Sequence, residues 1–214
     1  MVAETQHAGR VVRRRRDPDR AERILAAAAR LAASRGFHTV GMTEIGAEAG
    51  IVGSGIYRHF ASKEAILVAL LDRGMARLEA GAADALDRAR SDAEALLLLV
   101  KDHIAVALTH RSELAVYHRE SHTLPEDERR SLRRRQRHYV EDWVHVLGPL
   151  RPDLADAELR LAVHAATGAI QSTLFFRSGL EPERMTVRLA ELAHGCLGVP
   201  LSEPPDTAIE VNSK

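Results

Sequence analysis

The sequence from Met42 to Phe60 reads MTEIGAEAGIVGSGIYRHF and predicts two short helices, 42–49 and 53–59, on either side of a turn at Gly50. Another helix follows from Ser62, whose side chain can cap its N-terminus. Two short helices joined by a glycine-containing turn form the helix-turn-helix plan, in which the second helix enters the DNA major groove. The stretch therefore predicts a DNA-binding protein.

The composition of the 214-residue chain favours a helical protein. Aromatic residues make up only 4%, whereas Ala and Leu are abundant, which favours helices over a β-sandwich. No run of about 18 apolar residues could span a membrane, so no membrane partner is expected. No apolar stretch follows the N-terminal arginines, as it would in a secretory signal. The single cysteine, Cys196, cannot form an internal disulfide, and a cytoplasmic location is expected.

Charge is distributed unevenly along a chain whose net charge is zero. Residues 1–63 carry 11 Lys and Arg and 6 Asp and Glu, a surplus of +5 that the remainder balances with −5. A basic N-terminal third beside an acidic remainder is typical of a small DNA-binding unit attached to a larger domain that does not touch DNA. A flexible basic arm is predicted over residues 1–16, ending in Arg13, Arg14, Arg15 and Arg16.

Caps, breaks and apolar spacing predict an all-α chain without a strand. Beyond the arm we expect a DNA-binding domain over 17–63, a larger helical domain over 64–199 and a loose tail over 200–214. Gly36 is predicted to end the first helix, and Gly148-Pro149 to break a later one. Besides 42–49 and 53–59, the expected helices are 19–35, Ser62 to about 89, 92–109, 112–122, 125–147, 155–178 and 182–196.

The helix-turn-helix residues divide into buried and DNA-facing sets. Met42, Ile45 and Ala49 share a face that should pack on the first helix, and Ile56 and Phe60 are expected as buried anchors. Hydroxyls can donate to phosphates, and arginine can bind guanine or a phosphate. A small amphipathic helix cluster is the alternative, because such patterns also arise by chance. Besides the arm arginines, the candidate DNA contacts are Thr43, Gly53, Ser54, Gly55, Tyr57, Arg58, His59 and Lys63, the last as a phosphate ligand.

A set of short motifs between residues 20 and 72 carries a family resemblance. They are Ile24-Leu25 followed by Ala27-Ala28, Gly36-Phe37, Ile45-Gly46, Ala49-Gly50-Ile51, Ile56-Tyr57-Arg58-His59-Phe60 and Ser62-Lys63-Glu64-Ala65-Ile66-Leu67. In order and spacing they resemble the N-terminal domain of the TetR (tetracycline-repressor-like) family. Two positions depart from the pattern, since the family usually has Ser or Thr at Val52 and often Gly at Ser54. Losing the Ser or Thr removes a cap or phosphate ligand.

The resemblance implies a homodimeric transcriptional regulator, usually a repressor, with no cofactor. It implies an N-terminal three-helix helix-turn-helix domain and a larger C-terminal helical domain for ligand binding and dimerisation. The implied partners are a palindromic double-stranded DNA operator and a small hydrophobic or acyl-type effector that spreads the two DNA-binding heads. A ligand-independent DNA-binding protein of the same shape and a helical enzyme are the alternatives. No phosphate loop, cysteine cluster or nucleophile elbow predicts an enzyme.

Several residues of the larger domain are candidates for an apolar ligand pocket with a few polar groups. Tyr139 and Trp143 lie four residues apart, although ordinary core packing also explains them. The arginine-rich run from Arg129 to Arg137 is interpreted as a solvated helix face, an anionic-ligand site or a second nucleic-acid patch. His118 and His122 are too few ligands for a metal, and no metal is expected. The candidate ligand-binding residues are His103, Tyr139, Trp143, His164 and Gln171.

Small residues in the predicted helix 155–178 favour close packing against another helix. Leu161, Gly168 and Phe175 recur every seven residues and could form one seam. We interpret this helix, together with 182–196, as the dimer interface, and an intramolecular core is the alternative. The candidate interface residues are Leu161, Ala165, Gly168, Ser172 and Phe175.

Overall fold

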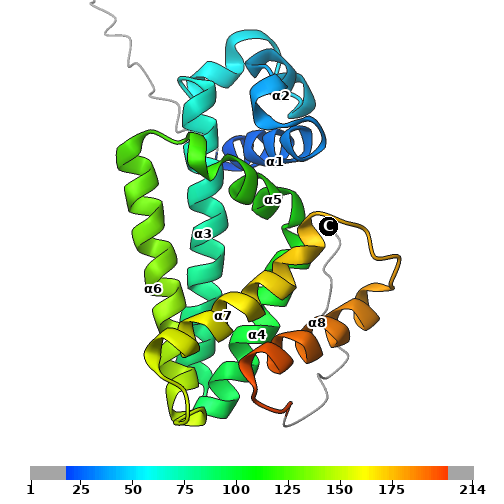
Figure 1. Ribbon diagram of the computed structural model, residues 1–214. Helices are drawn as coiled ribbons and strands as arrows, with labels where there is room; N and C mark the ends of the chain where they lie inside the picture. Colours follow the sequence, from blue (N-terminus) through cyan, green and yellow to red (C-terminus); the bar gives the residue numbers. More distant parts are fainter. Residues whose placement is uncertain (1–17, 202–214) are drawn as a thin grey trace, which may run out of the picture.

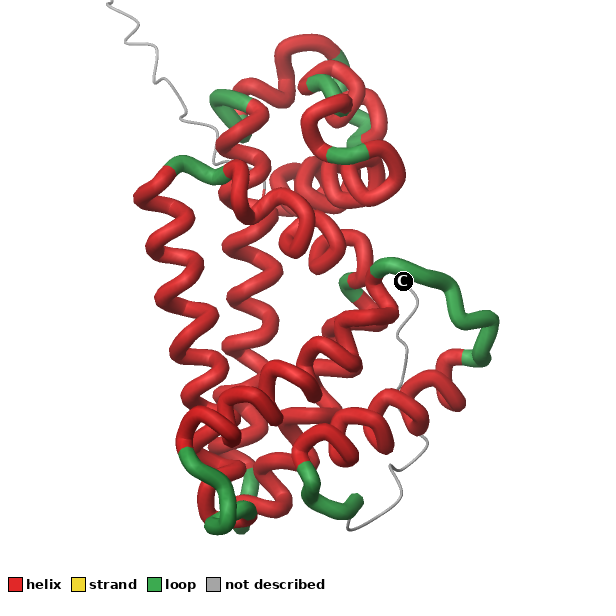
Figure 2. The backbone as a smooth tube through the Cα atoms, in the orientation of Figure 1, coloured by secondary structure: helices red, strands yellow, loops and turns green. Residues whose placement is uncertain are grey.

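The computed structural model describes residues 18–201, and every regular element in that range is helical. Figure 1 shows a small head built from α1 and α2 at one end and a larger body below it, and Figure 2 shows helices throughout. The α-helices are α1 Pro18–Arg35, α2 Met42–Glu48, α3 Lys63–Arg88, α4 Asp92–Thr109, α5 Arg111–Glu120, α6 Glu126–Leu150, α7 Asp156–Gln171 and α8 Pro182–Leu197. The 3-10 helices are η1 Phe37–Thr39, η2 Gly53–Arg58, η3 Ser121–Thr123 and η4 Ser172–Leu174.

The head closes around a few buried side chains through two glycine turns. Gly36 ends α1 with φ 84°, and Gly50 follows α2 with φ 69°, both in the left-handed region that favours glycine. The Ile51 amide donates to the Gly46 carbonyl at 2.8 Å, which returns the chain toward α1. Ile45 and Ile56 are almost fully buried. The predicted turn at Gly50 and the helix end at Gly36 are therefore confirmed.

The body is organised around α3, which runs out of the head and lies beside α6 (Figure 1). Ser62 and Ser91 cap α3 and α4, since each hydroxyl accepts from an amide three residues later at 3.2 Å. Helix α5 contacts both α1 and α3, and α7 packs along α8. Trp143 lies fully buried in the core between these helices. Because α5 contacts α1 of the head as well as α3, it connects the head to the body.

Four of the predicted helices differ from the structure. The segment 53–59 is a 3-10 helix rather than an α-helix, because glycines at 53 and 55 weaken helix formation. The predicted helix 155–178 ends at Gln171, where the Ser172 and Thr173 hydroxyls donate to the Ala169 and Ile170 carbonyls and compete with the backbone. α6 continues through Gly148-Pro149 to Leu150, because a proline in the last turn leaves the preceding turns intact. The helix predicted over 112–122 is divided into α5 and η3.

An unpaired acid lies where α3 and α4 pack closely. A Cβ on Gly81 would meet the Asp102 carboxyl at 1.7 Å, so a larger residue at position 81 would force the Asp102 side chain to move. Asp102 Oδ2 is buried without a hydrogen-bond partner among the described residues. Burial, reinforced by the nearby Asp84, raises the pKa of Asp102 to about 6. The folded chain therefore binds a proton at Asp102 more tightly than the unfolded chain does.

We expect Asp102→Asn to stabilise the protein at pH 8 and to have little effect at pH 4. The native pKa is raised, so stability is lost as the pH rises from the unfolded pKa of 3.8 through 6. Near pH 4 the folded acid is neutral and the unfolded acid is only about half ionised, which leaves a small effect. The gain at pH 8 should be about 1–2 kcal/mol, since partial exposure screens the charge. Urea unfolding at both pH values measures it, with Asp87→Asn as the exposed control. An equal effect at both pH values would contradict the assignment.

Candidate functional site

The surface of the head presents four of the predicted DNA contacts. Thr43, Ser54, Tyr57 and Arg58 are exposed, and the Tyr57 side chain retains 55% of its accessible area. Gly55 and His59 are half-buried. Gly53 opens η2, and the predicted arm contacts Arg13, Arg14, Arg15 and Arg16 lie outside the described residues. Except for Thr43 on α2, these exposed polar side chains lie on η2.

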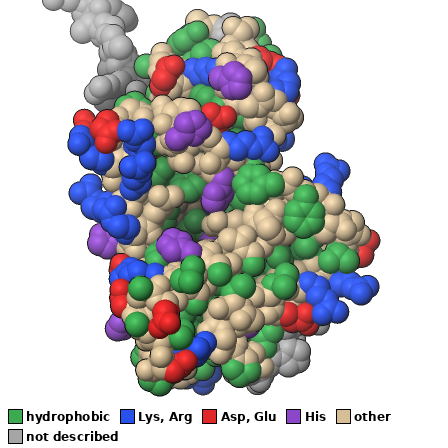
Figure 3. Space-filling model, in the orientation of Figure 1, with side chains coloured by type: hydrophobic (Ala, Val, Ile, Leu, Met, Phe, Trp, Pro, Cys, Tyr) green, Lys and Arg blue, Asp and Glu red, His purple; other side chains and the backbone are tan. Residues whose placement is uncertain are grey.

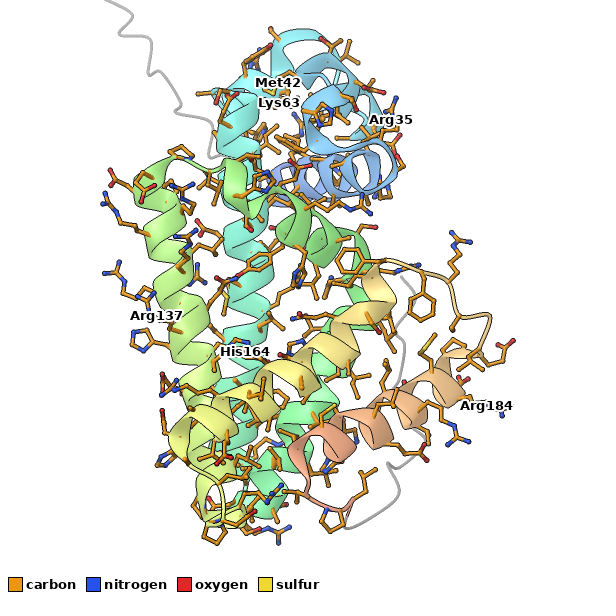
Figure 4. The ribbon with its side chains drawn as sticks, in the orientation of Figure 1. Arg35, Met42, Lys63, Arg137, His164 and Arg184 are labelled. Carbon is orange, nitrogen blue, oxygen red and sulfur yellow. The ribbon has the colours of Figure 1, made fainter. Side chains whose placement is uncertain are left out.

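Lys63 makes contacts within the head, and its phosphate contact stays a prediction. Its Nζ donates to the His38 carbonyl at 2.8 Å and lies 5.1 Å from the centre of the Phe37 ring. Both contacts hold the first turn of α3, labelled at Lys63 in Figure 4, to the segment between α1 and α2. In this conformation the ammonium stabilises the head.

Val52 is a surface feature that the sequence reasoning did not include among the DNA contacts. It precedes η2, makes no side-chain cap, and remains 95% exposed. An apolar side chain so exposed beside a recognition segment can contact the methyl group of thymine. The departure from Ser or Thr at this position was the available signal.

The head is joined to the body by charged and polar contacts of α5. Arg73 on α3 donates to both Glu113 oxygens, at 2.7 and 3.2 Å, and to Glu22 of α1 at 2.6 Å. Arg119 donates to the Ala33 carbonyl at 3.0 Å, and Glu120 accepts from the Phe37 amide at 3.1 Å. A movement of α5 would therefore shift α1 and the segment that follows it.

A cavity of about 530 Å³ opens between α3, α5, α6 and α7. Figure 3 shows the surface hollowed in this region, with histidine side chains at its rim. This volume lies within the usual range of small-molecule sites. The cavity is lined by Met75, Leu78, His103, Tyr117, His118, Arg133, Gln136, Arg137, Tyr139, Val140, Arg160, His164, Thr167 and Gln171.

Three predicted ligand residues form a hydrogen-bonded row in the cavity wall. His103 Nδ1 lies 2.7 Å from the Tyr139 hydroxyl, and its Nε2 lies 3.2 Å from the Gln171 amide nitrogen. Burial lowers the pKa of His103 to about 3, so the ring is neutral near pH 7. When the Gln171 amide nitrogen donates to Nε2 of His103, the neutral ring carries its proton on Nδ1 and donates it to the Tyr139 oxygen. The Tyr139 O–H is then free to bind an acceptor on a ligand.

The other two predicted ligand residues separate. His164 lines the cavity and comes from α7, where Figure 4 labels it. Trp143 is fully buried outside the set of lining residues and packs edge-on against His103 at 5.9 Å. Trp143 therefore supports the cavity wall rather than lining it.

The predicted interface residues all lie exposed on one side of the body. Leu161 and Phe175 keep 69% and 55% of their accessible area, and nearby α8 exposes Leu192 at 58%. Figure 3 shows apolar side chains gathered over α7 and α8. Ala165, Gly168 and Ser172 are exposed between them. The intramolecular-core alternative fails, since a core would bury these side chains.

Residues 18–201 contain neither a metal-binding cluster nor a membrane-spanning helix. No group of three or more His, Cys, Asp or Glu side chains in that range is arranged to hold a metal ion. None of the helices described there is long and apolar enough to cross a membrane.

Comparisons with known proteins agree with this architecture. The family model for bacterial regulatory proteins of the tetR family matches residues 24–70, and that for the tetracyclin repressor-like C-terminal domain matches residues 89–175. No curated protein matched the sequence.

Solved structures with the same fold include a TetR-family transcriptional regulator from Bordetella parapertussis 12822. It is 24% identical, with a TM-score of 0.73, over 81% of this chain and 93% of that chain. The ketosteroid transcriptional regulator KstR2 of Mycobacterium tuberculosis is 25% identical, with a TM-score of 0.70, over 84% and 96%. AibR, solved in complex with isovaleryl coenzyme A and operator DNA, is 22% identical, with a TM-score of 0.68, over 80% and 96%.

We expect Tyr57→Ala to weaken operator binding about tenfold and to change stability by less than about 0.5 kcal/mol, because the side chain is exposed. The neighbouring Ile56 is 1% exposed, so Ile56→Ala should instead cost about 2–5 kcal/mol of stability. Fluorescence anisotropy on a duplex selected from a random library, with thermal unfolding, separates the two effects. Full affinity in a folded Tyr57→Ala protein would remove η2 from the DNA interface.

Proposed function

Because the chain belongs to the tetR family of bacterial regulatory proteins, we propose that it is a homodimeric repressor released from a palindromic operator by a small hydrophobic or acyl-type effector. Residues 17–63 would bind DNA, and residues 64–199 would bind the effector and form the dimer. The complex of AibR with isovaleryl coenzyme A and operator DNA supports this type of effector. Being a transcriptional regulator follows from the family, whereas repression and the effector are our inference.

The observation that carries the proposal is the position of α5 between the cavity and the head. Tyr117 and His118 line the cavity, while Glu113, Arg119 and Glu120 on the same ten-residue helix bind head or junction residues. A ligand that displaces Tyr117 or His118 therefore acts on the element that holds α1. No further element is needed between the cavity and the head to transmit the change.

Release follows from a shift between two arrangements of the heads. A ligand shifts that equilibrium only by its difference in affinity for the two arrangements. The effector must therefore fit the cavity better when α5 has moved, and DNA must bind better when it has not. By linkage, operator DNA weakens effector binding by the same factor.

The exposed face of α7 and α8 would form the dimer. Large apolar residues exposed together are typical of an interaction surface, and this face includes Leu161, Phe175 and Leu192. A Cβ on Gly168 would meet nothing within 4 Å, so its outer surface is open to a second helix. A dimer joined through this face could place its two heads over two DNA half-sites that lie one helical turn apart, or a multiple of one turn.

We expect Gly168→Arg to yield a monomer or an altered dimer with operator affinity reduced at least about tenfold. The arginine fits the isolated fold, so each head should stay folded. Size-exclusion chromatography with light scattering measures the assembly, and Ala83→Arg on the exposed side of α3 is the control. A monomeric wild type at micromolar concentration would refute the dimer, whereas a mutant dimer with full DNA affinity would refute this face.

We expect Arg119→Ala to keep effector affinity and to reduce effector-induced operator release about three- to tenfold. The variant loses the hydrogen bond to the Ala33 carbonyl, which is worth about 0.5–1.5 kcal/mol. Operator affinity is measured with and without isovaleryl coenzyme A and longer acyl-coenzyme A compounds. Arg130→Ala, which removes an exposed ion pair on α6, is the matched control. Operator binding that no such compound changes in the wild type would refute release by acyl effectors.

A further inference from the structure

The walls of the cavity carry positive but no negative side chains. None of the described residues that line it is Asp or Glu, whereas Arg133, Arg137 and Arg160 all contribute. The lining also includes apolar residues, of which Met75 and Leu78 are buried, whereas Arg133 and Arg137 are exposed at the surface. A cavity that is apolar within and basic at its mouth favours a ligand with an apolar body and an anionic end.

The ion pairs of α6 show which arginines retain an unbalanced charge. Arg129 pairs with Glu126, Arg130 pairs with Asp127, and Arg135 binds Glu79 and Asp72. By contrast, Arg133 and Arg137 have no ion pair or hydrogen bond with the residues that the structure describes. They lie four residues apart, on one helix face, and both belong to the cavity wall.

The arginine across the mouth is already neutralised. Arg160 of α7 binds both oxygens of Glu141 and, through Nε, the Asp156 carboxylate at 2.9 Å. Figure 4 shows Arg137 extending from α6 into the solvent, on a helix that faces the His164 helix. The uncompensated positive charge at the mouth therefore comes from Arg133 and Arg137 of α6. Both side chains are long enough to turn toward a ligand.

The interior offers hydrogen-bond donors in addition to this charge. The Tyr117 hydroxyl donates to the Met75 sulfur, a weak acceptor at 3.5 Å, and also interacts with the Gln136 side chain. The row Tyr139, His103 and Gln171 presents a second polar point in the same wall. A ligand with an oxygen acceptor along its body could bind these groups, whereas a cationic ligand would find no acid in the described wall.

We propose that the effector is an amphiphilic anion whose apolar chain fills the cavity and whose carboxylate or phosphate binds Arg133 and Arg137. This inference rests on the proposed function, in which the cavity is the effector site. Planar guanidinium groups bind both kinds of anion through paired N–H donors. The shared chemistry fits a free carboxylic acid as well as a phosphate-bearing acyl thioester.

Calorimetry with three probes of equal chain length tests the head group. Decanoate, decyl phosphate and decanol are titrated into the full-length protein below the concentrations at which they form micelles. We expect both anions to bind at least about tenfold more tightly than decanol, since hydrogen bonds between charged groups contribute more than neutral ones. Whichever of the carboxylate and the phosphate binds more tightly identifies the source of the anionic group.

A double variant and a matched control locate the charge. Arg133→Gln with Arg137→Gln should weaken anion binding about 10–100-fold and leave decanol affinity unchanged. Arg134→Gln is the control, because Arg134 is exposed in the same run but does not line the cavity. Thermal unfolding confirms that each variant is folded, since all three positions lie on the surface of α6.

Two results would overturn the inference. One is that decanol binds the wild type as tightly as the anions do, and the other is that the double variant binds the anions as the wild type does. In either case operator release by the probes would still support the proposed function. If no probe binds, the inference also falls, and the acyl-coenzyme A release measurement then decides separately whether the protein is effector-responsive.

Discussion

The head keeps its angle to the body through one nearly buried ion pair, Arg73–Glu113. Their side chains are only 13% and 10% exposed, and Arg73 also reaches Glu22 of α1 while Arg77 reaches Glu113. Removing one partner of such a pair typically costs about 3–5 kcal/mol, because the other charge stays buried without compensation. Apolar packing would tolerate sliding between α1, α3 and α5, whereas a two-point guanidinium–carboxylate contact fixes their register. That register sets the position of α5. Because α5 contacts α1 and also lines the cavity, it affects the position of both the head and one cavity wall.

Ion pairs join the helices that form the cavity walls. Protein interiors are normally close-packed, so an opening of about 530 Å³ leaves dispersion contacts unmade. Arg135 binds Glu79 and Asp72 and secures α6 to α3, and Arg160 binds Glu141 and secures α7 to α6. These pairs lie near the surface and are individually weak, yet each has a direction that apolar contacts lack. The positions of these ion pairs therefore help to set the positions of the cavity walls.

Features that depend on neighbouring residues could be predicted from the sequence, whereas features that depend on contacts between distant segments could not. Gly36, Gly50 and Ser62 act within a few residues of themselves, so the head's turns and the start of α3 were predicted correctly. The position of Trp143 behind the cavity wall was not predicted, because it depends on His103, a partner from another segment. The hydrogen bond from Lys63 to the His38 carbonyl was not predicted for the same reason. The arginine run looked uniform in sequence. Only the fold shows which of its members meet an acid on α3.

The weakness of the recognition segment explains why the body should control it. η2 has six residues, two of them glycines at 53 and 55, and 3-10 geometry gives poor hydrogen bonds, so ordering it on DNA costs conformational entropy. One head of this kind would bind weakly. In the proposed dimer the second head binds at a high effective concentration, and that gain disappears when the spacing between heads no longer matches the two half-sites. A small displacement of α5 would then suffice for release, because it needs to change only the spacing and not the contacts of either head.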